Sequence, residues 1–258
     1  MNWQTLVAAC LVIVTACTTS NPTQPEPNTP DTHKLVASGA VGTLTVNLYA
    51  DTSLTAGYNP VFVRATLDGK PIEGYVTIGT TMDMGTMTHS CPIVQPNQTP
   101  DSAGFFHGAI VFTMPGTSNE WTVHVNVINP TTGTTTTVSV GVDVSGSSLV
   151  KTVKSGSVKT IIAMLPQSWK VGKNDIEFAI FRGTDPMYPA LDSATVTMVP
   201  SMPSMGHGSY GNINPVQQEN KRYRGVVNYS MTGDWKIDLS IATTDDVPVV
   251  ASFNVTVP

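Results

Sequence analysis

Two short segments of the chain combine methionine and histidine with identical spacing, and both follow the pattern Met-x-x-Met-x-His. Their donor residues are Met84, Met87 and His89 in the first copy, and Met202, Met205 and His207 in the second. Thioether sulfur and imidazole nitrogen are neutral ligands that suit a soft metal ion such as Cu(I). The pattern therefore predicts a copper site in one or both segments.

Methionine also fills gaps in apolar cores, and that alternative stays open for both segments. Three observations favour metal binding: histidine recurs at the same step, further methionines lie nearby, and glycine, serine, threonine and proline surround the donors. Polar loops of this kind do not need several methionines for packing. Asp83 is the carboxylate beside the first copy, and Ca²⁺ or Mg²⁺ would need more oxygen ligands than this.

Cys91 lies two residues after His89 and is a candidate fourth ligand. The other two cysteines of the chain, Cys10 and Cys17, lie in the first 17 residues, so Cys91 has no disulfide partner in the folded part. Two interpretations stay open for it. It is either a metal ligand or a small buried apolar side chain.

Both segments belong to a longer internal repeat with an offset of about 115 residues, close to the size of one β-sandwich domain. Ahead of the donors, the repeat has Gly57 and Asn59 in the first half and Gly172 and Asn174 in the second. After the donors come Phe106, Met114 and Trp121 in the first half, and Tyr223, Met231 and Trp235 in the second. The repeat predicts two tandem domains, with the two tryptophans as core anchors.

Short runs of alternating apolar and polar residues, as in residues 43–49, are typical of β-strands, and turn signals separate them. No window with helical periodicity follows the first 17 residues. The chain is therefore expected to be all-β, with two immunoglobulin-like β-sandwiches at residues 34–145 and 149–258. Gly85, Pro203 and Gly206 interrupt the strand pattern, so the donor segments are expected to be loops.

Residues 1–17 have the features of a signal peptide, because the apolar run at residues 6–16 is too short to span a membrane. Its end, Val14-Thr15-Ala16-Cys17, resembles a bacterial lipobox, although no lysine or arginine precedes the run. The resemblance implies that Cys17 is lipidated and anchors the chain in the bacterial cell envelope, at the outer membrane or the periplasmic face. Residues 18–33, rich in proline and threonine, are expected to form an extended tether.

Composition and missing motifs exclude several classes of function. Charged residues make up 12% of the chain and the formal net charge is -5, with no basic run, so nucleic acid is not an expected partner. The chain lacks a nucleophile elbow, a His-Glu-x-x-His motif and a phosphate loop. We therefore do not expect an enzyme.

Each half of the chain resembles the YtkA-like domain, which is related to FixH-type proteins. In the second half the similarity rests on residues 202–208, the Tyr223-x-Gly225 step and the Met231-x-Gly233-x-Trp235 step. The first half departs from the pattern, since a longer gap separates Met114 from Trp121. The resemblance implies exported or membrane-anchored sandwich domains linked to copper handling.

Two hypotheses of function follow. The first is a lipid-anchored copper-binding protein that passes the metal to a copper-receiving protein, because thioether and imidazole ligands exchange readily. The alternative is a structural or adhesive module of the cell envelope, whose sandwich loops contact a protein partner.

Overall fold

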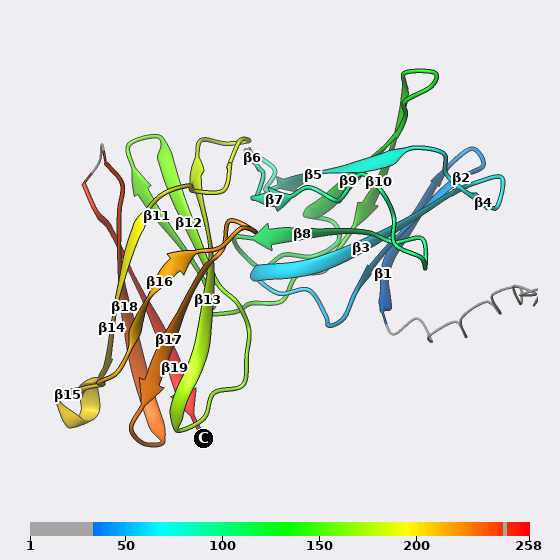
Figure 1. The fold of residues 1–258 in the computed structure, drawn as a ribbon. Coiled ribbons are helices and arrows are strands. Elements are labelled where there is room, and N and C mark those ends of the chain that lie inside the picture. The colour runs from blue at the N-terminus through cyan, green and yellow to red at the C-terminus, as the bar shows by residue number, and fades with distance from the viewer. Residues whose placement is uncertain (1–32, 245–246) are drawn as a thin grey trace, which may run out of the picture. The chain divides into compact units, whose positions relative to one another are not determined.

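The computed structural model of the protein describes residues 33–244 and 247–258, and their regular secondary structure consists almost entirely of β-strands (Figure 1). The described residues form one compact unit. The predicted signal peptide and the predicted tether lie outside the described residues, apart from His33 at the end of the tether. The all-β prediction is confirmed, and the described residues form two immunoglobulin-like β-sandwiches in tandem.

The first sandwich is built from two antiparallel sheets. One sheet has the order β1 (Lys34–Val41), β2 (Leu44–Ala50), β3 (Gly57–Leu67), β8 (Phe106–Phe112) and β7 (Ile93–Val94), with the short β4 (Lys70–Pro71) beside β3. The other has the order β10 (Thr134–Gly141), β9 (Trp121–Asn129), β5 (Tyr75–Asp83) and β6 (Thr88–His89).

The second sandwich repeats this topology. Its first sheet has the order β11 (Val150–Ser155), β12 (Val158–Met164), β13 (Gly172–Gly183), β17 (Tyr223–Tyr229) and β16 (Ile213–Gln217). Its second sheet has the order β15 (His207–Gly208), β14 (Thr195–Met202), β18 (Gly233–Ala242) and β19 (Val249–Val257), and the 3-10 helix η1 (Pro203–Met205) joins β14 to β15. Apart from the short β4, each strand of one sandwich has its counterpart in the other. The exact domain boundaries stay a prediction, because both sandwiches lie within one compact unit.

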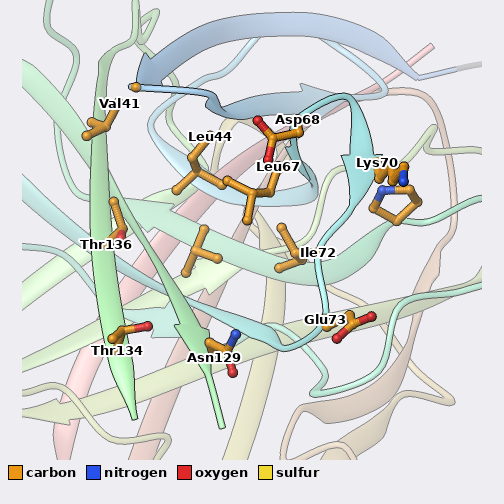
Figure 2. A pocket seen from close by; sticks show the side chains of 13 residues that line it. Val41, Leu44, Leu67, Asp68, Lys70, Ile72, Glu73, Asn129, Thr134 and Thr136 are labelled. Carbon is orange, nitrogen blue, oxygen red and sulfur yellow. The ribbon is translucent and has the colours of Figure 1, made fainter. Parts of the chain in front are cut away.

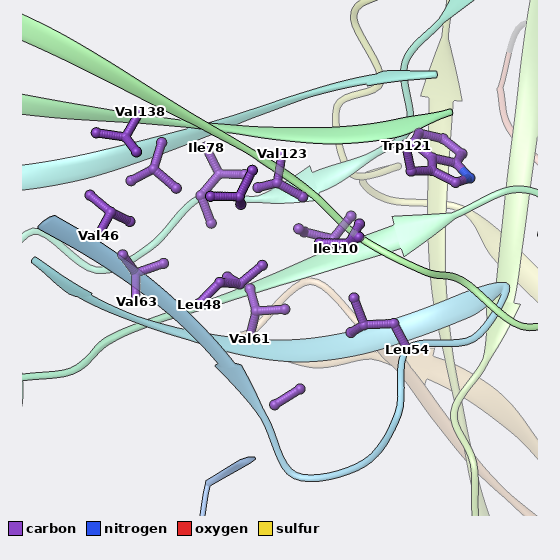
Figure 3. Packing of buried hydrophobic residues seen from close by; sticks show 14 of the residues in the cluster. Val46, Leu48, Leu54, Val61, Val63, Ile78, Ile110, Trp121, Val123 and Val138 are labelled. Carbon is purple, nitrogen blue, oxygen red and sulfur yellow. The ribbon is translucent and has the colours of Figure 1, made fainter. Parts of the chain in front are cut away.

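Apolar residues at every second position of the strands form the core between the two sheets. Figure 3 shows this packing in the first sandwich, where Val46, Leu48 and Val61 of one sheet face Ile78 and Val123 of the other. Burying one such side chain fully contributes about 1.5–3 kcal/mol, so these rows supply most of the driving force for folding.

The tryptophans of the repeat are buried, as predicted, and each fixes the turn that precedes its strand. The indole nitrogen of Trp121 donates a hydrogen bond to the Met114 carbonyl at 3.2 Å, and that of Trp235 donates to the Met231 carbonyl at 3.1 Å. The shared Met and Trp of the repeat therefore encode one structural contact that occurs twice.

The asparagines of the repeat make a second set of contacts that occurs in both sandwiches. The Asn59 side chain accepts a hydrogen bond from the Thr55 backbone nitrogen and donates to the Thr55 and Gly57 carbonyls, at 2.8–2.9 Å. Asn174 makes the same three contacts with Lys170 and Gly172, at 2.7–3.0 Å. Each amide thereby closes the loop that leads into the long strand β3 or β13.

A separate buried apolar cluster joins the two sandwiches. Val111 of β8 packs in it together with residues of the second sandwich, which are Ile161, Ala163, Ala179, Phe181 and Tyr188. Tyr58 of β3 packs against the same cluster. In the repeat, Tyr58 corresponds to Lys173 and Val111 to Asn228, so this surface is apolar only in the copy that buries it.

We predict that Asn59→Ala and Asn174→Ala each lower the free energy of unfolding by about 1–3 kcal/mol, because each leaves three backbone groups without their partner. Urea unfolding of the purified protein measures this loss. Asn254→Ala, at an exposed position of β19, is the matched control and should change stability by no more than about 0.5 kcal/mol. Equal losses in all three variants would contradict the role given to the two buried amides.

Candidate metal site

The loop expected for the first donor segment is the turn of a hairpin, which holds Met84 and Met87, whereas His89 lies in the short strand that follows. Strand β5 continues to Asp83, β6 begins at Thr88, and Met82 pairs with His89 across the hairpin. The Met84 backbone nitrogen donates to the Met87 carbonyl at 3.0 Å, which closes a tight turn. Gly85 takes a φ of 79° there, which a side chain would disfavour.

The hairpin brings two of the predicted ligands into contact. His89 Nε2 lies 3.2 Å from the Met87 sulfur. Met84 and Met87 are 49% and 54% exposed, so both side chains lie at the surface. Among the described contacts, none joins the Met84 sulfur to His89.

Cys91 points away from this pair. It is 2% exposed within the core of the first sandwich, and its sulfur lies 3.2 Å from the Thr80 hydroxyl. Burial raises the pKa of the Cys91 thiol to about 12, and the hydrogen bond with Thr80 lowers it only in part. A neutral buried thiol is a poor metal ligand, so its position favours the apolar interpretation.

The donors of the second copy separate. Met202 is 3% exposed and packs in the core, whereas Met205 at the end of η1 is 63% exposed. Met202 pairs with His207 across the hairpin of β14 and β15. The His207 ring lies edge-on to Trp235, with 5.7 Å between the ring centres.

Pairing across the hairpins shows that the two methionine-histidine segments do not align as their sequences suggest. Met82 is the structural counterpart of Met202, because each pairs with the histidine of its hairpin and each is buried. The first hairpin is therefore longer by two residues, and Met84 belongs to this extra length. The sequence offered a signal for this, since the alternation of β5 from Val76 places Met82 on the core face.

Asp185, in the connection after β13, is the residue of the site that sequence reasoning missed. Its Oδ2 lies 3.2 Å from His89 Nδ1, and its Oδ1 accepts from the Ser90 nitrogen and hydroxyl, each at 3.1 Å. Lys159 Nζ lies 3.6 Å from Oδ2. Partial burial opposes ionisation of Asp185, but the hydrogen bonds from Ser90 and His89 and the charge of Lys159 outweigh it and lower its pKa.

Other kinds of site have little support in the part of the chain that the structure describes. No group of three or more His, Cys, Asp and Glu side chains within residues 33–244 and 247–258 is arranged to hold a metal ion. This statement concerns those four residue types and does not apply to a site that uses methionine. The same residues contain no helix long and apolar enough to cross a membrane.

One cavity of the first sandwich has a volume of about 560 Å³. Figure 2 shows Leu44, Leu67 and Ile72 in its lining, together with the charged Asp68 and Glu73. None of the predicted metal ligands lines it. A smaller cavity of about 230 Å³ lies beside His89, Ser90 and Lys159.

Comparisons with known proteins give a likeness of fold. No family model matches the chain, and no curated protein matches it. Domains 5–6 of the S-layer protein SbsC are 9% identical with a TM-score of 0.32, over 87% of this chain and 98% of that one. The Yersinia pseudotuberculosis adhesin InvE is 14% identical with a TM-score of 0.27, over 85% of this chain and 60% of that one. The Escherichia coli adhesin FdeC is 11% identical with a TM-score of 0.27, over 87% of this chain and 66% of that one. At such low TM-scores the likeness carries no functional argument.

The raised pKa of Cys91 predicts that the folded protein resists alkylation. Near neutral pH, iodoacetamide should modify Cys91 about a thousandfold more slowly in the folded protein than in urea, because the folded thiol ionises far above the ordinary value of about 8.5. Since the folded pKa is the higher one, Cys91 stabilises the fold fully below about pH 8.5 and loses this contribution as the pH rises toward 12. Mass spectrometry of the alkylated protein measures the rate, and equal rates in both states would contradict the buried placement.

Proposed function

We propose that this protein is a non-enzymatic structural or adhesive module of the bacterial cell envelope, anchored through a lipid on Cys17. The observation that carries the proposal is the buried cluster around Val111 and Phe181, which joins the two sandwiches. Contacts between domains of one chain usually permit relative motion unless they are apolar and well buried. A junction of this kind suits a spacer that holds its loops in a fixed direction.

Loops of the second sandwich offer the contact surface for a protein partner. Tyr210 is 88% exposed, and Met205 and Met231 are also exposed. The Asn228 side chain donates to the Tyr210 carbonyl at 2.8 Å, which ties the loop after β15 to strand β17. Exposed aromatic and methionine side chains on well-held loops are typical of protein interfaces.

We predict a single, narrow distance between spin labels on the two sandwiches. Labels on cysteines introduced at Thr134 and Val250, both exposed, would be measured by pulsed electron paramagnetic resonance. Replacing Val111 and Phe181 together by serine should broaden the distribution, because it removes the apolar contact. Val216→Ser, at an exposed apolar position of β16, is the control that should leave it narrow.

A distance distribution as broad in the unchanged protein as in the junction variant would overturn the spacer proposal.

For the partner contact, a photo-crosslinking residue at Tyr210 should capture a protein in intact cells, whereas the same residue at Thr134 should not. Release of the protein from the membrane fraction by Cys17→Ser tests the anchor.

A second function, soft-metal binding, is favoured by one specific contact, the 3.2 Å between His89 Nε2 and the Met87 sulfur. Metal–nitrogen and metal–sulfur bonds are roughly 2.0–2.3 Å long, so one ion can bind both atoms after little movement. Thioether and imidazole ligands suit Cu(I) as a cargo that is passed on to a partner protein. Cys91 and the second copy do not fit such a site as well, because Cys91 and Met202 are buried in the core.

We predict that Met87→Ala and His89→Ala each weaken Cu(I) binding at least about tenfold, equivalent to about 1.4 kcal/mol, because each removes one of the two side chains that bind the ion. Titration against a coloured Cu(I) chelator measures the dissociation constant. The matched pair Met205→Ala and His207→Ala in the second sandwich should change it less than about twofold. Absence of binding by the unchanged protein, or an equal loss in both pairs, would exclude the site at the first hairpin.

A further inference from the structure

The carboxylate of Asp185 contacts the first sandwich although the residue belongs to the second. It lies in the connection from β13 to β14, where the Met187 nitrogen donates to the Thr184 carbonyl at 2.6 Å and closes a turn. This turn presents the carboxylate to two adjacent residues of the first sandwich. His89 contacts Oδ2, and the Ser90 nitrogen donates to Oδ1 at 3.1 Å and to Oδ2 at 3.4 Å.

The contact with Asp185 determines which nitrogen of His89 carries the hydrogen. An ionised carboxylate only accepts hydrogen bonds, so Nδ1, at 3.2 Å from it, must be the donor. In the neutral ring, Nε2 then carries a lone pair, and this lone pair faces the Met87 sulfur at 3.2 Å. Neither Nε2 nor the sulfur carries a hydrogen, so no hydrogen bond joins them. Both atoms can therefore donate a lone pair to one metal ion that binds next to them.

We propose that Asp185 is a positioning residue that holds His89 in the tautomer and orientation needed to bind a soft metal ion. The inference rests on the metal-binding function proposed above for Met87 and His89, and it makes the site dependent on both sandwiches. Histidines that bind metals commonly donate their second nitrogen to a carboxylate, which fixes the ring and raises its basicity.

The second hairpin provides an internal comparison. The ring contact described for His207 is the edge-on packing against Trp235, and no carboxylate contact of His207 is described within residues 33–244 and 247–258. Its orientation is thus set by the core of its own sandwich. Duplication supplied two histidines, but only the first lies at a junction where a carboxylate reaches it.

Dependence on two sandwiches has a reciprocal consequence. If docking of the second sandwich favours metal binding, then metal binding favours docking by the same factor. A bound ion would therefore hold the junction more firmly, and loosening of the junction would favour release of the metal to a partner.

The test measures the Cu(I) dissociation constant of the full-length protein and of Asp185 variants by competition with a coloured chelator. Asp185→Ala should raise it about ten- to hundredfold, which is the usual effect of removing such an outer-sphere partner. Asp185→Asn keeps an acceptor for Nδ1 and should show a smaller loss. Asp192→Ala, in the same connection but without a contact to His89 or Asp185 among the described residues, is the control and should change it less than about twofold.

Nitrogen-15 NMR of the His89 ring in the metal-free protein gives a readout that a purely structural role would not change. The hydrogen should lie on Nδ1 in the unchanged protein and in Asp185→Asn, and should shift to Nε2 in Asp185→Ala. Cu(I) binding that requires Met87 and His89 but not Asp185, with an unchanged tautomer, would overturn this inference and leave the metal site standing. Absence of Cu(I) binding by the unchanged protein would overturn both.

Discussion

Burial of apolar surface between the two sandwiches is the interaction on which the rest of the arrangement depends. Val111 and Phe181 are withdrawn from water there, and a cluster of this size contributes several kcal/mol through area alone. The polar contacts of Asp185 lie beside this cluster and could not hold the junction alone, since partly exposed ion pairs contribute little. Apolar burial supplies most of the free energy that holds the two sandwiches together, and the contacts of Asp185 help to fix their relative orientation.

Much of the fold could be predicted from the sequence because it follows from local rules. Alternation of apolar and polar residues predicts the long strands, and the repeated Trp121 and Trp235 predict two equivalent cores. The short β6, β7 and β15 were not predicted, because two-residue strands are too brief for any periodicity. The sequence does not predict the edge strands β1 and β11 either, since none of their residues is buried and their core side is only partly covered.

The candidate site was predictable only in part, for a physical reason. Met87 and His89 are two residues apart and meet within one hairpin, so their spacing carries the information. Asp185 lies 96 residues from His89 in the chain, and only the docking of the sandwiches brings it near. Cys91 is close to His89 in sequence, yet its side chain enters the core beside Thr80. Two residues that are close in sequence can therefore point their side chains in different directions.

The structural and the metal-binding hypotheses use the two copies of the hairpin differently. In the first sandwich the hairpin lies against the second sandwich, and its histidine meets Asp185. In the second, Met205 in the hairpin and Tyr210 in the loop after it are exposed. One duplicated element can therefore serve metal binding at the junction and partner contact at the other copy.

The replacement of Tyr58 and Val111 by Lys173 and Asn228 in the second copy has a consequence for assembly. A third sandwich docking there as the second docks on the first would have to cover an ammonium group and an amide, and burying such groups without partners is costly. A further unit, or a second copy of the chain, that docked in the same way would therefore bind less strongly, which disfavours growth into a filament by this contact.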